Sequence, residues 1–158
     1  MDEKSRSALD AKFAQLKSRF GSCYPTAEAD EISAFEVKLS AELPPEFRYF
    51  LRLLGGGYCP DGIEISSEVE EIQDDAVTVF QSLNAESPSS RLGAFAADFE
   101  ENKNIIQVLQ FADTVGGERL VMDLRRKNYG HIFYSCPDGT WRQIADSFAQ
   151  FIDQLELT

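Results

Sequence analysis

The sequence has 158 residues, of which 43% are hydrophobic and 27% are charged, and its formal net charge at pH 7 is −12. A chain of this length and composition can bury enough apolar surface to form one compact domain without a disulfide or a metal. The negative charge argues against a surface for nucleic acid or for anionic membranes, because both require clustered Lys and Arg.

Three helices are expected in the first third of the chain. Apolar residues recur with helical spacing over residues 9–20 and predict a first helix that ends at Gly21. A second helix is expected over residues 26–39, with Thr26 as its N-cap. A third helix is expected to begin at residue 43 and to end at the glycine triplet 55–57, because glycine adopts the left-handed conformation that closes a helix.

The rest of the chain predicts mainly strands. Residues 62–66 alternate like a strand, residues 74–83 are expected to be helical, and no element is predicted between residues 91 and 104. A meander and a closing helix follow at residues 105–111, 119–124, 131–136, 141–144 and 147–155. The short turns imply antiparallel neighbours. The fold class is therefore α+β, with N-terminal helices, a central antiparallel meander and a C-terminal helix packed on the sheet.

The negative charge is concentrated in the middle of the chain. Between residues 61 and 101, eleven acidic residues face a single base, Arg91. This stretch is either a solvated surface or a docking surface for a basic protein, which complementary charge would attract. The residues expected to bind such a partner are Glu64, Glu68, Glu70, Glu71, Asp74, Asp75, Asp98, Glu100 and Glu101.

No catalytic, cofactor or metal site is predicted. The acidic run lacks the alternating Asp/Asn–Gly loop that calcium requires, and no Gly-Lys-Ser/Thr follows the glycine triplet to form a phosphate loop. His131 and Cys136 lie at opposite parity on one expected strand, which argues against a catalytic dyad. Trp141 is expected to pack in the fold, with an interface anchor as the alternative.

Cysteine usage and the first residues favour a cytoplasmic protein. The three cysteines are widely spaced and form no CxxC pair, so neither a disulfide framework nor a zinc site is expected. The mixed charges after Met1 do not resemble a signal peptide, and no run of residues is long and apolar enough to span a membrane.

Three segments, in this order and spacing, resemble the SUKH superfamily, the Smi/Knr-like domain. The first, residues 31–57, has the helix pair with Leu43-Pro44-Pro45-Glu46-Phe47 and the glycine triplet. The second, residues 113–132, is similar to the family's hairpin, with Gly116-Gly117 and Met122-Asp123-Leu124. The third, residues 144–152, is similar to its closing helix. The resemblance implies a single domain over residues 1–158, with residues 1–25 as an N-terminal helical extension.

The resemblance also implies a function. Bacterial members of the superfamily are largely immunity proteins, which bind and silence a cognate polymorphic toxin that is often a nuclease or another enzyme acting on nucleic acid. The chain is therefore expected to bind a basic protein toxin, and neither nucleic acid nor membranes. The alternative that the resemblance leaves open is a regulatory or scaffold domain of the cell-wall-regulator type. Neither branch implies an enzyme, and the oligomeric state stays open.

Overall fold

A computed structural model describes the backbone of residues 1–98 and 105–158, and the side chains of residues 1–93 and 108–158. The helices in the described residues are α1 (Glu3–Ser18), α2 (Ala29–Leu39), α3 (Pro45–Leu53), α4 (Glu70–Gln73) and α5 (Phe148–Asp153), with short 3₁₀ turns at Pro88–Ser90 and Arg126–Asn128.

The strands form one antiparallel sheet. Its order is β1-β2-β3-β5-β6-β7-β8, and β4 pairs with β5 beside this path. The register sets Asp113 of β5 opposite Arg119 of β6, and Ile132 of β7 opposite Ala145 of β8. The strands in the described residues are β1 (Ser22–Cys23), β2 (Gly57–Glu64), β3 (Ala76–Phe80), β4 (Gly93–Asp98), β5 (Ile105–Thr114), β6 (Arg119–Met122), β7 (Ile132–Ser135) and β8 (Trp141–Ala145). In the described residues, α1 to α4 precede β3, and α5 follows β8.

Local sequence explains where the helices begin and end. The Asp2 carboxylate accepts a hydrogen bond from the Ser5 amide at 2.7 Å and caps α1. Helix α2 begins later than the Thr26 cap predicts, because Glu28 and Glu31 form a capping box. Gly55, with a φ of 80°, follows α3, and a Cβ there would lie 2.3 Å from the Pro25 carbonyl oxygen.

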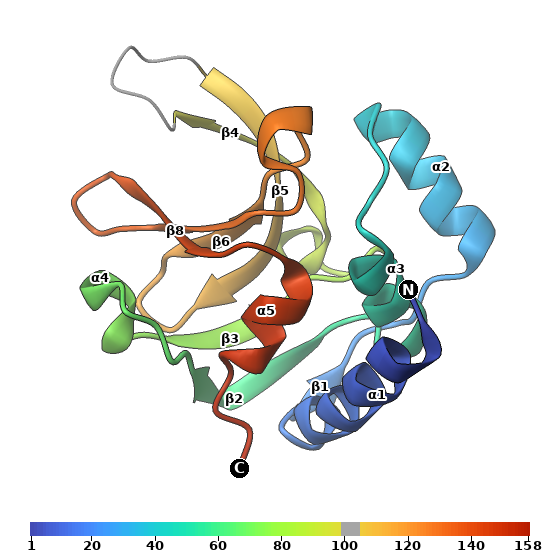
Figure 1. Ribbon diagram of the computed structural model, residues 1–158, viewed down its shortest axis with the longest axis horizontal. Coiled ribbons are helices and arrows are strands. Elements are labelled where there is room, and N and C mark those ends of the chain that lie inside the picture. Colours follow the sequence, from blue (N-terminus) through green and yellow to red (C-terminus); the bar gives the residue numbers. More distant parts are fainter. Residues whose placement is uncertain (99–104) are drawn as a thin grey trace.

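Helices α1, α2, α3 and α5 lie on one side of the curved sheet, and α4 lies apart from them (Figure 1). Helices α1, α3 and α5 lie against the sheet, and α2 lies outside α3 (Figure 1). Phe13 and Leu16 of α1 are fully buried in the same cluster as α3 and α5. The N-terminal helix is therefore part of the core.

Aromatic rings fill the space between the helices and the sheet. Phe47 of α3 lies edge-on to Phe148 of α5, with ring centroids 4.9 Å apart, and its ring also contacts Phe50 and Phe111. Such pairs add specific geometry to the hydrophobic burial. Trp141 is partly buried and packs against a second, smaller cluster that is formed by Val108 and Val121. This position agrees with its expected packing role.

The predicted α+β class is confirmed, one local prediction is wrong, and one expected strand has different bounds. Residues 74–83 were expected to be helical, but they contain β3, whose Val77, Thr78 and Val79 prefer the extended backbone. The strand expected over residues 62–66 begins earlier, at Gly57, because a register shift between Tyr58 and Ile63 interrupts the alternation that a regular strand shows.

Candidate protein-binding surface

Helix α4 presents the densest part of the acidic run. Its Ile72 is fully buried in the core and fixes the orientation of this short helix. Glu68, Glu70 and Asp74 are exposed around it. These three carboxylates therefore surround α4, which lies on the left side of Figure 1, with negative charge.

Two other acids of this run take part in the fold. The Glu71 carboxylate pairs with the Arg142 guanidinium of β8 at 2.8 Å. The Asp75 carboxylate accepts hydrogen bonds from the Ala76 amide at 2.8 Å, the Gly116 amide at 2.9 Å and the Tyr134 hydroxyl at 2.8 Å. Glu71 and Asp75 thus hold α4 against the sheet.

Glu64 lies at the end of β2, beside an acid that is distant in the sequence. The Glu156 amide donates a hydrogen bond to the Glu64 carbonyl oxygen at 2.9 Å. The side chains also meet, and a hydrogen bond to the Glu64 carboxyl raises the pKa of Glu156. Glu156 is exposed and adds to the same end of the molecule.

The structure brings the predicted acids together only in part. Glu68, Glu70, Glu71, Asp74 and Asp75 lie on and around α4, and Glu64 ends the strand that precedes them. The Asp98 side chain and residues 100–101 lie outside the described residues.

A hollow of about 550 Å³ is lined in part by Glu68. One wall is residues 66–69, the other is residues 143–146 at the end of β8, and Gln150 and Gln154 also line it. Asp146 is exposed and contributes a second carboxylate to this hollow. The sequence analysis missed Asp146 and Glu156, because nothing in their local sequence places them beside residues 64–70.

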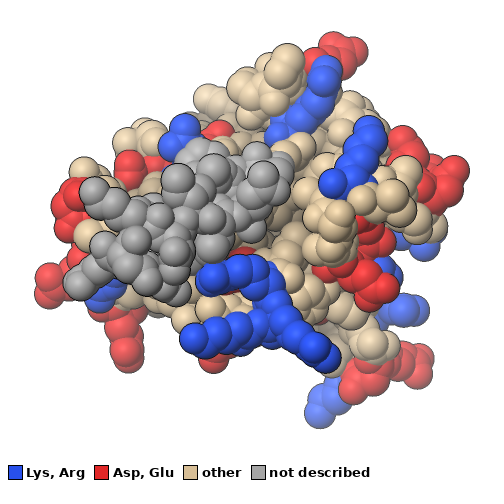
Figure 2. Space-filling view, turned by 90° about the horizontal axis from the view of Figure 1, so that it is seen from above, with Lys and Arg blue, Asp and Glu red and all other residues tan. Residues whose placement is uncertain are grey.

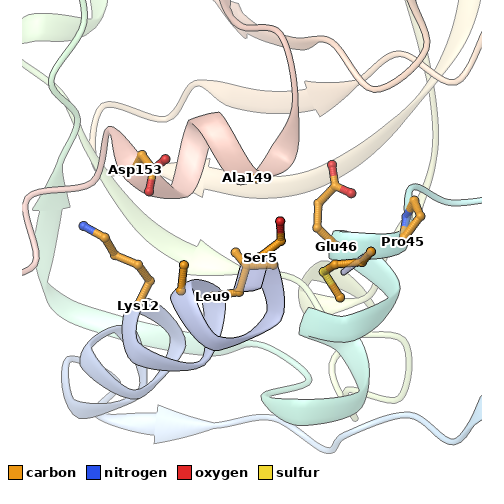
Figure 3. Close-up of a pocket in the computed structure, with 9 residues that line it drawn as sticks. Ser5, Leu9, Lys12, Pro45, Glu46, Ala149 and Asp153 are labelled. Atoms are coloured by element: carbon orange, nitrogen blue, oxygen red, sulfur yellow. The ribbon is translucent and has the colours of Figure 1, made fainter. Parts of the chain in front are cut away.

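A second hollow of about 420 Å³ lies between α1, α3 and α5 (Figure 3). Lys12 and Asp153 lie at one end, and Ser5 and Glu46 lie at the other (Figure 3). Leu9 contributes an apolar side chain. This hollow carries both charges, with Lys12 beside the two carboxylates of Glu46 and Asp153, and it lies between helices that are not part of the acidic surface.

A third hollow of about 570 Å³ lies beside Asp113 and is lined by Arg91 and Arg119. The Asp113 carboxylate accepts hydrogen bonds at 2.7 Å from the side-chain amides of Gln81 and Gln110. Burial raises the pKa of Asp113. The two arginines make this hollow the least negative of the three, which sets it apart from the surface around α4.

The surface charge is uneven. Seen from above, acidic side chains lie along both the left and the right margins, and several Lys and Arg side chains group near the middle (Figure 2). The described residues contain no group of three or more His, Cys, Asp or Glu arranged to hold a metal ion. Within the same residues, no helix is both long and apolar enough to cross a membrane.

The helix-backed antiparallel sheet and its acidic end define a small α+β domain. Residues 26–154 match the SMI1 / KNR4 family (SUKH-1), and the chain belongs to this family. Proteins of this family are immunity or regulatory proteins rather than enzymes. No curated protein and no solved structure matches the chain. The family match begins after α1, although α1 contributes to the core.

Proposed function

We propose that the protein is a cytoplasmic immunity protein that binds a basic cognate toxin, a nuclease or another enzyme acting on nucleic acid, and neutralises it. The observation that carries this proposal is the exposed acidic surface around α4, which we define as Glu64, Glu68, Glu70, Asp74, Asp146 and Glu156. Membership of the SMI1 / KNR4 family supports the same reading.

The acidic surface suits inhibition of a nucleic-acid enzyme for two reasons. Carboxylates arrayed on one side can occupy a groove that binds phosphates, since both groups are anionic oxygen acceptors. Complementary charge also raises the association rate from about 10⁵–10⁶ towards about 10⁸ M⁻¹s⁻¹ at low salt. Fast capture matters for an inhibitor that has to bind the toxin before it reaches its substrate.

Co-expression with a candidate toxin, taken first from any toxin gene found next to this one, tests the proposal. Growth of cells that carry the active toxin is expected to require this protein. The double variant Glu70→Lys/Asp74→Lys should lower the association rate about tenfold or more at low salt and reduce protection. Both residues are exposed, so the substitutions should leave folding intact.

The matched control is Glu42→Lys/Glu86→Lys, which changes the net charge equally at exposed positions away from α4. At about 0.1 M salt its association rate should fall by no more than about threefold, and by less than that of the α4 variant, since charges farther apart than about 10 Å are largely screened there. Equal effects of the two double variants would reject the α4 surface as the binding site.

A regulatory domain of the cell-wall type is the alternative. Such a domain would bind a partner protein without protecting cells from a toxic enzyme. Full growth inhibition despite stable co-expression would therefore reject the immunity function and favour regulation.

A further inference from the structure

In the part of the chain that the structure describes, the outer edge of β8 after Trp141 is open to a further strand. β8 ends the sheet and pairs only with β7 among the strands of the described chain. An edge strand presents unpaired backbone N–H and C=O groups, which an extended segment of another chain can pair with.

The hollow of about 550 Å³ follows this edge. One side of the hollow is lined by the last residues of β8 and by Asp146, which follows it. The other side is lined by residues 66–69. A strand that entered the hollow would therefore lie between β8 and the segment that leads into α4.

Side chains shield the edge in the unbound protein. The Gln154 side-chain amide donates a hydrogen bond to the Ile144 carbonyl oxygen at 2.6 Å, and the Gln143 side-chain amide donates one to the Ala145 carbonyl oxygen at 3.4 Å. These contacts occupy acceptors that a backbone N–H would otherwise reach. Flexible amide side chains can be displaced by an arriving strand, so they protect the edge without closing it.

The charged side chains that line the hollow are negative, so the hollow suits a cation. Glu68 and Asp146 line it from opposite walls, and neither Lys nor Arg is among its lining residues. The Gln154 Oε1 atom is buried and has no hydrogen-bond partner among the described residues, so displacement of this side chain by an arriving strand would expose one further acceptor. Lys and Arg carry only donors, so they complement a site made of acceptors.

We propose that an extended basic segment of the protein partner adds to the outer edge of β8 as a strand, with a Lys or Arg side chain between Glu68 and Asp146. This inference rests on the proposed function for the identity of the partner. It specifies how the partner binds, through backbone pairing to β8 combined with charge pairing in the hollow.

Amide hydrogen exchange tests the backbone pairing. The probe is the toxin that the co-expression experiment identifies, in a catalytically inactive form. Amides of β8 that exchange freely in the unbound protein should become protected at least about tenfold in the complex, because the new strand satisfies them. Binding through side chains alone would leave their exchange unchanged, and this result would overturn the inference while the immunity function stands.

Charge reversal tests the hollow. Glu68→Lys/Asp146→Lys should weaken toxin binding by about tenfold or more, whereas Glu42→Lys/Glu86→Lys should change it by no more than about threefold. Rescue of the first variant by a Lys→Glu substitution in the bound segment of the toxin would identify the pairing. Equal weakening by both double variants would overturn it.

A second arm applies if no toxin is neutralised and the proposed function fails. The probe is then an eight-residue peptide of alternating Lys and Val, compared with one of alternating Glu and Val. Amide chemical shifts of residues 66–69 and 143–146 should move with the basic peptide alone, and Glu68→Lys/Asp146→Lys should abolish the change. No change with the basic peptide would overturn strand addition independently of any toxin.

Discussion

The Tyr134 hydroxyl of β7 donates a hydrogen bond to the Asp75 carboxylate at 2.8 Å, although β7 lies three strands from β3, which Asp75 precedes. Tyr134 is only 1% exposed. Burial of the hydroxyl is the main cause that raises the pKa of Tyr134, and the hydrogen bond to Asp75 is the second cause. An acid within the most negative run of the sequence is therefore a structural acceptor.

Loss of this acceptor should destabilise the fold. Asp75→Ala leaves the Tyr134 hydroxyl and the Gly116 amide without their partner and should lower the free energy of unfolding by about 2–4 kcal/mol. Urea denaturation measures the change. Asp74→Ala, at the exposed neighbouring position, is the control and should stay within about 0.5 kcal/mol. Equal stability of the two variants would contradict the structural role of Asp75.

The contact between Phe47 and Phe148 predicts a large cavity effect. Phe47 is fully buried, so Phe47→Ala should lower the free energy of unfolding by about 3–5 kcal/mol. Val37→Ala on α2 removes an apolar side chain that is 79% exposed and should change stability by less than about 0.5 kcal/mol. Thermal and urea unfolding of both variants check this difference, and a small effect of Phe47→Ala would disprove the described core.

Helix α1 should contribute to stability even though the family match begins after it. Phe13 is fully buried, and its ring lies 5.5 Å from Phe50, so Phe13→Ala should cost about 3–5 kcal/mol. The exposed control on the same helix, Gln15→Ala, should be close to neutral. A Phe13→Ala protein as stable as the control would show that α1 is dispensable for the core.

The three thiols should differ in reactivity. Burial raises the pKa of Cys59 to about 12 and also raises the pKa of Cys136, whereas Cys23 is exposed. Since the thiolate is the reactive form, iodoacetamide at pH 8 should label Cys23 first, and the other two thiols only after unfolding. Peptide mass spectrometry checks this order. Rapid labelling of Cys59 in the folded protein is the result that the structure forbids.

The carboxyl pair at the end of β2 should give a pH dependence. The Glu64 carboxyl raises the pKa of Glu156 in the folded protein, so the folded state holds this proton more tightly than the unfolded state. The resulting stabilisation is present below the unfolded pKa and is lost as pH rises through the folded pKa. Glu64→Gln should lower the pKa of Glu156 in a carboxyl NMR titration, whereas Glu3→Gln, an exposed position on α1, should leave it unchanged.

Helical periodicity and turn residues predicted most of the fold. The stripe over residues 9–20 predicted α1, and strand and turn patterns predicted the order of β5–β8 and α5. The prediction for residues 74–83 failed because the buried Val77 and Phe80 have the i, i+3 spacing of a helical face. In the structure a register shift between Val77 and Val79 interrupts the alternation of β3, and both side chains are buried. The sequence could predict the acidic surface around α4 only for those acids that lie close together along the chain. The tertiary fold alone places Asp146 and Glu156 beside residues 64–70, and local sequence could not separate the structural Asp75 from the exposed Asp74.

Helices α1 and α5 contact each other, and the Arg19 guanidinium, just after α1, donates hydrogen bonds to the Glu156 carbonyl oxygen at 3.1 Å and to the Gly62 carbonyl oxygen at 2.9 Å. The apolar face of α1 is therefore fully covered only when α5 packs against it. During translation, residues 148–156 emerge from the ribosome after every other part of the core. The protein consequently completes its fold only once these residues have been released from the exit tunnel, and a truncated nascent chain exposes α1 to chaperones and proteases.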